Sequence, residues 1–298
     1  MTAAVVQLAA ADFQEAMDFL DLVFGGYRPH DFENLLPSVY RPTDEAMACL
    51  AAIREEGRLR AIVGAHPRTW RLADRTLRLA GVGGVSTHRK SRGRGYMRRL
   101  MEHCVSTMAA TGVQVSHLGG QRQRYQHFGY ERCGRALQFT ASRANLGPAL
   151  PGAAADLRFE AIDAQRTEWL ARARALHESQ PACSLRPADE FLGRLRSWHH
   201  VPHAALDGQG RMVGYLTANA DGTRIGELVT ESDETFDRVV RSWVAHRGSC
   251  TLALPPLATA QARLLAGWCE TVTVQPTGNW RVFDWPAVVG ALLYARHR

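Results

Sequence analysis

Several features that mark other classes of protein are missing from this sequence of 298 residues. It contains no run of about 18 apolar residues and opens with no charged-then-apolar leader, so we expect neither a transmembrane span nor a signal peptide. The expected location is cytoplasmic, with no membrane partner. The 6 cysteines form no CxxC pair and no Cys/His spacing typical of metal sites. We therefore expect free, mostly buried thiols and no metal.

Lysine is almost absent, because Lys90 is the only one among 36 basic residues. A net charge of +7 could indicate a nucleic-acid partner. However, the arginine bias is typical of a GC-rich coding sequence, and the aromatic residues that single-strand binders use for stacking are missing around the densest arginine cluster. We therefore expect no nucleic-acid partner, and nucleic-acid binding through that cluster is kept as the least favoured alternative.

A strand-to-helix junction dominates what is present. An apolar run ends near Thr87, and an amphipathic helical pattern begins at Tyr96. Between them lies a turn that contains Gly93 and Gly95 among arginines. The first amides of a helix lack internal partners and glycines let a ligand approach them, so this turn could hold a pyrophosphate. The plainer alternative is a glycine turn beside a solvated arginine face; neither a P-loop nor a dinucleotide-binding glycine motif is present.

The continuation makes the junction more specific. Residues 113–118 alternate like a strand, Gly119-Gly120 ends it, and a short helical segment closes with Phe-Gly-Tyr at 128–130. This order resembles the acetyl-CoA-binding region of the GNAT superfamily of N-acetyltransferases. Its phosphate turn, Gln/Arg-x-x-Gly-x-Gly/Ala, falls on Arg92, Gly95 and Met97, and the last position departs from the pattern.

With a bulky residue at that last position, the turn resembles that of the Eis-like (enhanced intracellular survival) branch of the superfamily. Residues 32–37, the Arg-Tyr-x-x-Phe-Gly-Tyr block, a second half without a phosphate turn and the closing segment 280–284 also resemble that branch. Longer members of the branch continue into a sterol-carrier-like domain, and we expect this chain to stop before it.

The expected fold class is α/β (α+β), with two tandem GNAT-like domains, each a mixed, mostly antiparallel sheet flanked by helices. We expect a catalytic domain at 1–146, a linker at 147–156 rich in Gly, Pro and Ala, and a degenerate second domain at 157–298. The second copy has Glu231-Ser232-Asp233-Glu234 at the equivalent junction. Acidic residues suit a helix N-terminus but repel a pyrophosphate, so this copy should not bind coenzyme A.

The resemblance implies acetyl-CoA as co-substrate, without a metal. Where the antiparallel meander meets the parallel strand 113–118, splayed strands could admit the pantetheine arm. The expected cofactor-binding residues are the backbone of the preceding strand, the glycine turn with the start of its helix, and the loop after the parallel strand: Val85, Ser86, Thr87, Arg92, Gly93, Arg94, Gly95, Tyr96, Met97, Arg98, Gly120 and Gln121.

The resemblance also implies catalytic and acceptor residues. Tyr125 matches the family's general acid, since a phenol with a pKa of about 10 can protonate a thiolate. A backbone N–H near Val85 would stabilise the oxyanion. The base stays open between His117, a water chain and the Arg298 carboxylate. The acceptor would lie against aromatic and acidic residues of the first domain, namely Phe24, Tyr27, Phe32 and Glu33.

The sequence therefore predicts an acetyl-CoA-dependent N-acetyltransferase that acts on a primary amine of a small molecule or a lysine side chain. The alternative from another class is a non-enzymatic acyl-CoA sensor. A homo-oligomer is also open, because the tryptophan-rich last quarter of the chain could hide an interface.

Overall fold

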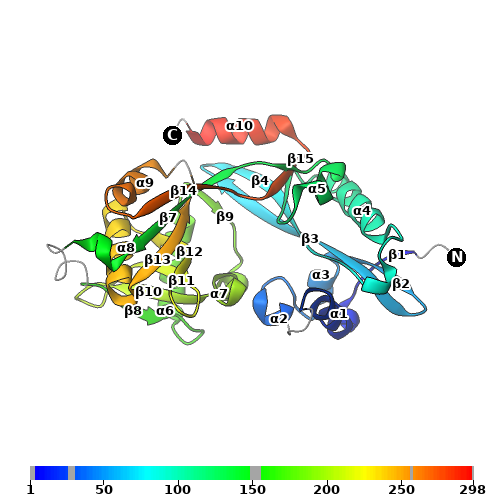
Figure 1. Cartoon of the computed structure of the whole chain (residues 1–298), viewed down its shortest axis with the longest axis horizontal. Helices are drawn as coiled ribbons and strands as arrows, with labels where there is room; N and C mark the ends of the chain where they lie inside the picture. Colours follow the sequence, from blue (N-terminus) through cyan, green and yellow to red (C-terminus); the bar gives the residue numbers. More distant parts are fainter. Residues whose placement is uncertain (1–3, 26–30, 148–155, 256–257, 297–298) are drawn as a thin grey trace. The chain divides into compact units, whose positions relative to one another are not determined.

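The computed structural model describes residues 4–25, 31–147, 156–255 and 258–296 (Figure 1). Contacts divide the chain into two compact units. Unit 1 comprises Met1–Cys133, Pro181–Leu185 and Gly278–Arg298, and unit 2 comprises Gly134–Gln180 and Arg186–Thr277. Each unit is a mostly antiparallel sheet flanked by helices, which confirms the expected fold class.

The units differ from the expected division at 1–146 and 157–298. Strand β7 (Arg135–Ser142) belongs to unit 2, because it pairs with β13 (Ser249–Leu254) and β14 (Thr271–Pro276). Strand β15 (Asn279–Val282) belongs to unit 1, because it pairs with β5 (Val115–Leu118). Residues 148–155 of the expected linker lie outside the described residues. Hydrogen-bonded pairing between distant strands, rather than composition, sets these boundaries.

The sheet of unit 1 has the strand order β1-β2-β3-β4-β5-β15-β6, with β9 on β3. Its remaining strands are β1 (Val5–Gln7), β2 (Leu50–Glu55), β3 (Arg58–Leu72), β4 (Arg75–Thr87), β6 (Glu131–Arg132) and β9 (Ala182–Ser184). Its helices are α1 (Phe13–Gly25), α2 (Phe32–Leu35), α3 (Asp44–Met47), α4 (Tyr96–Ala110), α5 (Arg122–Tyr125) and α10 (Trp285–Arg296).

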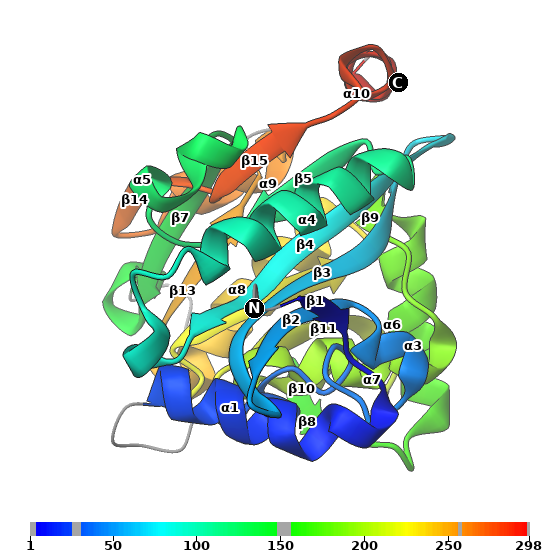
Figure 2. The ribbon, with the colours of Figure 1, turned by 90° about the vertical axis from the view of Figure 1, so that its right-hand side faces the viewer.

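Alternation along β3 explains how helices cover both faces of this sheet. Ala61 and Val63 pack in the cluster that includes α4, whereas Ile62 packs in the cluster that includes α1. Helix α4 buries Tyr96, Leu100, Met101, Cys104 and Met108, which recur at helical spacing along one stripe. Figure 2 shows α4 and α1 on either side of the β3–β4 hairpin.

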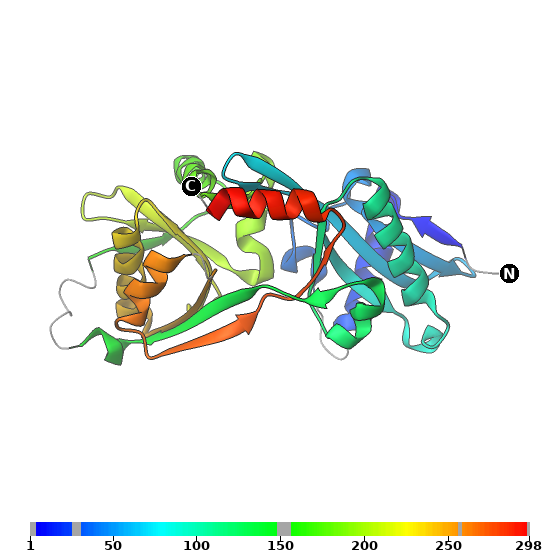
Figure 3. The ribbon, with the colours of Figure 1, turned by 90° about the horizontal axis from the view of Figure 1, so that it is seen from above.

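The sheet of unit 2 has the order β14-β7-β13-β12-β11-β10-β8, and Figure 3 shows β14 alongside β7 at its edge. The other strands are β8 (Arg158–Ala161), β10 (Val201–Leu206), β11 (Met212–Ala218) and β12 (Arg224–Thr230), and the helices are α6 (Thr167–Ser179), α7 (Ala188–Arg196), α8 (Asp233–Arg247) and α9 (Thr259–Ala266). The fully buried Trp243 of α8 anchors the core on one face of this sheet.

Each unit contains one parallel strand pair among the described residues. It is β4–β5 in unit 1 and β12–β13 in unit 2, and each is joined by a crossover helix, α4 or α8. The units thus repeat one topology, as the sequence predicts. Within the described part of the chain, no helix has the length and apolar character needed to cross a membrane.

Candidate active site

The parallel strands of unit 1 separate at one end. β4 and β5 are in register from Leu79 opposite Val115 to Val82 opposite Leu118, where β5 ends. β4 continues to Thr87, so Val85 and Thr87 lie beyond the end of β5. The side chain of Ser86 is buried and its hydroxyl donates to the carbonyl of Ile62 on β3 at 3.5 Å. Of these three residues, Ser86 can therefore offer a ligand only its backbone.

A bulge lies in β4 at the point where the strands part. The register with β3 shifts between Ile62 and Gly64, so that Val63 stands opposite two residues of β4, Gly84 and Val85. Gly84 has a φ of +60°, which glycine adopts without the strain that a side chain would cause. The bulge breaks the regular pairing of β4 with β3 at Val85, just beyond the last residue pair of β4 with β5.

The predicted phosphate turn leads into α4. Gly93 and Gly95 have φ values of +79° and +76°, and a Cβ at either position would meet no described atom within 4 Å. The amide of Arg99 donates to the Gly95 carbonyl at 3.1 Å and so closes the first turn. The amides before it have no helical acceptor and carry the positive end of the helix dipole. The turn therefore presents unused N–H groups to open space, as an anion requires.

Two side chains expected to contact the cofactor are held elsewhere. The Arg94 guanidinium donates to a Glu55 carboxylate oxygen at 2.6 Å, and the buried Tyr96 hydroxyl donates to the other oxygen. The hydrogen bond from Tyr96, followed by those from Arg94, lowers the pKa of Glu55. Arg94 and Tyr96 thus tie the turn to the end of β2 and offer a ligand their backbone amides. The exposed Arg92 and Arg98 form no side-chain hydrogen bond or ion pair with any of the described residues.

Tyr125 lies under the loop that follows β5. Its ring is buried, and its Cε2 lies 3.1 Å from the position that a Cβ of Gly120 would occupy, where φ is +111°. Burial raises the pKa of Tyr125, so the phenol keeps its proton at neutral pH. Gln121 precedes α5 and is exposed. The amide of the buried Asn279 on β15 donates to the Gly120 carbonyl at 3.0 Å and fixes this loop.

His117 does not share a sheet face with Tyr125. Its ring lies against Trp280 of β15, with 4.5 Å between ring centroids, and Trp280 packs in the cluster formed with Leu79 and Val115. Tyr125 packs in the cluster on the α4 side, to which Leu118, the next residue of β5, also belongs. The structure therefore places the two expected catalytic side chains on opposite faces of the sheet.

An aromatic row lines the α1 side of the bulge. Phe24 contacts Phe32 edge-on at 5.1 Å, Phe32 contacts Tyr40 at 5.4 Å, and Tyr40 contacts His66 at 5.7 Å between ring centroids. The Tyr40 hydroxyl lies 3.0 Å from where a Cβ of Gly84 would stand, so the row ends at the bulge. Of the other expected acceptor residues, Glu33 is exposed and Tyr27 lies outside the described residues.

Sequence reasoning missed Tyr40 and His66. The imidazole Nε2 of His66 would lie 2.5 Å from a Cβ at Gly64, so this histidine needs a glycine two positions earlier on β3. Burial raises the pKa of Tyr40, which keeps its hydroxyl protonated. The glycines at 64 and 84 are the sequence signal that the two side chains require, but only the folded hairpin brings Gly64, paired with Gly83, next to the bulge that contains Gly84. In the described residues, no group of three or more His, Cys, Asp or Glu could hold a metal.

Comparisons with known proteins agree with this geometry. Residues 5–133 match the family model described as Acetyltransferase (GNAT) domain. A comparison with curated proteins found no match. Among solved structures, a GCN5-related N-acetyltransferase from Kribbella flavida is 21% identical with a TM-score of 0.70, covering 97% of this chain and 74% of that one.

Two further solved structures extend the likeness across both units. Eis1 from Mycobacterium abscessus is 17% identical with a TM-score of 0.64, covering 97% of this chain and 76% of its own. A probable N-acyltransferase from Enterococcus faecalis V583 is 14% identical with a TM-score of 0.71, covering 96% and 74%. At these identities the structures show a common fold.

Proposed function

We propose that this chain, whose residues 5–133 match the GNAT acetyltransferase domain and whose tandem fold is similar to that of Eis1, transfers the acetyl group of acetyl-CoA to a primary amine of a small molecule or a lysine side chain. The observation that carries the proposal is the glycine turn before α4, with its open amides beside the separated ends of β4 and β5. We include the expected cytoplasmic location in this proposal.

The residues of the turn fit coenzyme A. The pyrophosphate would accept hydrogen bonds from the amides between Gly93 and Arg98, and Arg92 and Arg98 would add charge. The pantetheine arm would lie along the edge of β4 that β5 leaves open, where its amides could pair with the backbone of Val85 and Thr87. Bound acetyl-CoA supplies the activated acetyl group.

The proposed reaction is a direct aminolysis. The neutral amine attacks the thioester carbonyl, a C–N bond forms, and the C–S bond breaks when the tetrahedral intermediate collapses. The N–H of Val85 at the bulge would stabilise the oxyanion. Tyr125 would donate its phenolic proton to the departing thiolate. A base would accept the proton that the amine loses, and Tyr125 would regain a proton from solvent.

For the base we propose His66 rather than His117. Its imidazole lies on the α1 side of β3, in ring contact with Tyr40, whose hydroxyl lies beside Gly84 at the bulge. An amine that reaches the bulge along the row Phe24, Phe32 and Tyr40 would lie next to the ring pair of Tyr40 and His66. His117, by contrast, is packed against Trp280.

Replacing Tyr125 with Phe tests the acid. We expect kcat to fall by about 10²- to 10⁴-fold with little change in the Kd of acetyl-CoA, because the phenol acts on the leaving thiolate. Steady-state kinetics and calorimetric titration measure the two quantities. Tyr130→Phe is the matched control, since its hydroxyl contacts Ser116 Oγ at 2.7 Å in the same cluster. Unchanged turnover in Tyr125→Phe would refute the role, and wild type that binds acetyl-CoA yet acetylates no amine would indicate a sensor.

Replacing each histidine with Gln tests the base. If His66 removes the amine proton, His66→Gln should lower kcat/KM and abolish the acidic limb of its pH profile, whereas His117→Gln should leave the limb in place. The opposite pattern would assign the base to His117. If both variants kept the acidic limb of the pH profile, proton removal would fall to water and both assignments would be wrong.

A further inference from the structure

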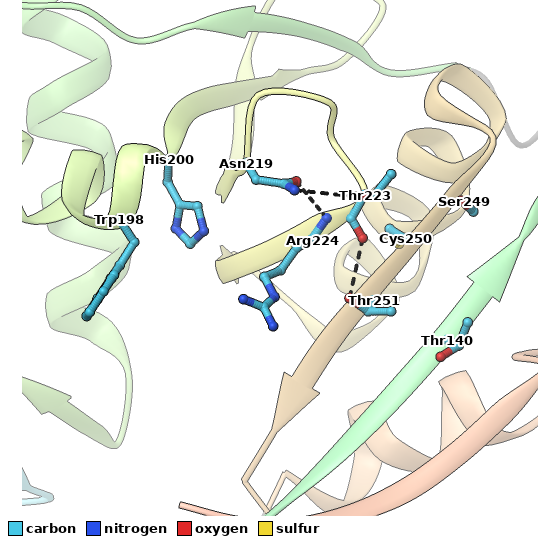
Figure 4. A pocket seen from close by; sticks show the side chains of 9 residues that line it. All are labelled: Thr140, Trp198, His200, Asn219, Thr223, Arg224, Ser249, Cys250 and Thr251. Carbon is cyan, nitrogen blue, oxygen red and sulfur yellow. Dashed lines mark hydrogen bonds between the residues drawn. The ribbon is translucent and has the colours of Figure 1, made fainter. Parts of the chain in front are cut away.

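A cavity of about 750 Å³ is lined by residues of unit 2 alone, whereas the residues of the proposed chemistry belong to unit 1. It opens where β12 and β13 begin, and its walls come from β7, from the segment after α7 and from the turn between β11 and β12 (Figure 4). This volume is in the range of sites that hold small organic ligands. The cavity does not need the glycine turn or Tyr125, so its use is independent of the proposed function.

Arg224 gives the cavity its charge. It is the one arginine, lysine or carboxylate among the described residues that line the cavity, and no described residue accepts a hydrogen bond from its guanidinium. Figure 4 shows this side chain extending toward the open space beside His200. An arginine without a protein acceptor presents a planar fork of donors that matches an anionic oxygen group.

A rigid turn holds Arg224 in place. Its backbone N–H donates to the Asn219 side-chain oxygen at 2.8 Å, and the Asn219 amide donates to the Thr223 hydroxyl at 3.3 Å. The Thr223 hydroxyl in turn donates to the Asp221 carboxylate at 2.6 Å. Because these polar groups satisfy one another, the turn fixes the base of the arginine and leaves its guanidinium for a ligand.

The opposite wall is built with unusual backbone geometry. Trp198 and His199 both have positive φ values, 64° and 54°, in a conformation that bulky residues rarely adopt. Trp198 lines the cavity and is 61% exposed. His200 follows, and its ring lies so close to β12 that a Cβ at Gly226 would stand 2.3 Å from it.

The imidazole of His200 can add a hydrogen bond to a ligand that Arg224 holds, without adding a second positive charge. Burial, and then the charge of Arg224, lowers the pKa of His200, so the ring is neutral at pH 7 and can donate one hydrogen bond. The cavity therefore combines one cation, one neutral donor, threonine hydroxyls at Thr140 and Thr251, and an exposed aromatic face. An indole face of this kind favours a flat apolar partner.

We propose that this cavity is a second ligand site, which binds a small organic anion with a planar ring, its anionic oxygens on Arg224 and its ring on Trp198. Carboxylates and phosphates share this chemistry. Since the lining belongs to unit 2 alone, the site would be occupied whether or not acetyl-CoA is bound.

The test uses the full chain labelled with 5-fluorotryptophan, with the Trp198 fluorine signal assigned from Trp198→Phe. Benzoate and phenyl phosphate are titrated separately, with benzamide as the uncharged analogue. We expect saturable shifts of the Trp198 signal with one or both anions, and at least tenfold weaker binding of benzamide. Whichever anion binds more tightly identifies the anionic group.

Three variants locate the site. Arg224→Gln should weaken the anion at least tenfold, whereas Arg263→Gln, which changes an exposed arginine of α9, should not. Gly226→Ala should weaken binding of the anion by displacing the His200 ring. Gly95→Glu, which fills the glycine turn of unit 1, should leave the affinity for the anion unchanged. Equal binding of benzamide, no saturable shift of the Trp198 signal, or unchanged affinity in Arg224→Gln would each overturn the proposal.

Discussion

The two strand-to-helix junctions are built on one topology but use their helix amides in opposite ways. Before α4, Gly95 caps the helix with a left-handed backbone and no side-chain hydrogen bond. Before α8, the Ser232 hydroxyl accepts from the Thr235 amide at 3.2 Å, and Asp233 and Glu234 follow in the first turn. In unit 2 a side chain caps the helix N-terminus and stabilises it, whereas in unit 1 no side chain caps the helix and its first amides stay available.

The strands that lead to these junctions also differ at an equivalent position, which is open in unit 1 and filled in unit 2. Two residues past the last pair with the neighbouring parallel strand, β4 has Gly84 and β12 has Glu227. Gly84 leaves room for the Tyr40 hydroxyl. Glu227 instead accepts two hydrogen bonds from Arg186, at 3.0 and 2.5 Å, and one from Tyr215 at 2.5 Å. The position beside the proposed reaction centre in unit 1 is filled by an ion cluster in unit 2.

The largest expected effect comes from making the first junction resemble the second. Gly95→Glu places a carboxylate before α4, where it would repel the pyrophosphate and occupy its amides. We expect the Kd of acetyl-CoA to rise by more than 100-fold, which is about 3 kcal/mol or more. Calorimetric titration should give one site per chain in the wild type and none in the variant.

Two controls separate charge from backbone strain in this experiment. Gly95→Ala keeps the strain of a positive φ without the carboxylate, and should lose less affinity than Gly95→Glu. Gly210→Glu introduces the same change at a φ of +79° in unit 2 and should bind acetyl-CoA like the wild type. If the wild type bound acetyl-CoA at two sites per chain, the inference that only the first junction binds the coenzyme would be wrong.

A smaller effect is expected from Glu227→Gln, through the stability of unit 2. Burial alone would raise the pKa of Glu227, but hydrogen bonds from His177, Arg186 and Tyr215 outweigh it and lower the pKa to about 2. The stabilisation is therefore complete above the ordinary value of 4.5 and is lost as the pH falls through 2. We expect the variant to lose about 2–3 kcal/mol at pH 7.

Urea unfolding followed by the fluorescence of the tryptophans, recorded from pH 7 to pH 2, measures this effect. The difference between wild type and Glu227→Gln should shrink steadily below pH 4.5. Glu178→Gln, which alters an exposed ion pair with Arg174 on α6, is the control and should change stability by less than about 0.5 kcal/mol. A difference independent of pH would contradict the ionic account.

The smallest effect is expected at the cap of α8. Ser232→Ala removes the hydroxyl that accepts from Thr235 and should cost about 1 kcal/mol of unfolding free energy, with no change in the Kd of acetyl-CoA. Chemical denaturation and calorimetric titration of the same preparation check both statements. Ser232→Asp, which restores a capping acceptor, should recover the stability. Weaker acetyl-CoA binding in Ser232→Ala would mean that unit 2 contributes to the coenzyme site.

The glycine turn and the duplicated topology could be predicted from sequence because they depend on short segments. Local periodicity identifies α4 and β5, and the positive φ values at Gly93 and Gly95 follow from the turn itself. The helix start at 231–234 of unit 2 could be predicted for the same reason, and Ser232 caps α8 there.

The parts that could not be predicted depend on pairing between distant segments. Asn279 holds the loop over Tyr125 by a hydrogen bond to Gly120, 159 residues away along the chain, and composition gives no sign of it. The face on which His117 lies follows from the packing of Trp280, which was expected in the other domain. Tyr40 and His66 meet only because the segment after α2 packs against the face of the sheet on which Ile62 of β3 lies.

The placement of β15 between β5 and β6 has a consequence for synthesis on the ribosome. Unit 1 acquires most of its strands early, yet the edge of β5 gains its second neighbour only after residues 279–282 have emerged, by which time all of unit 2 has been made. Until then an unpaired strand edge next to the proposed active site is open to wrong partners. The nascent chain must therefore protect that edge while the second unit folds, and the loop at Gly120 gains its hydrogen bond from Asn279 only when translation has passed residue 279.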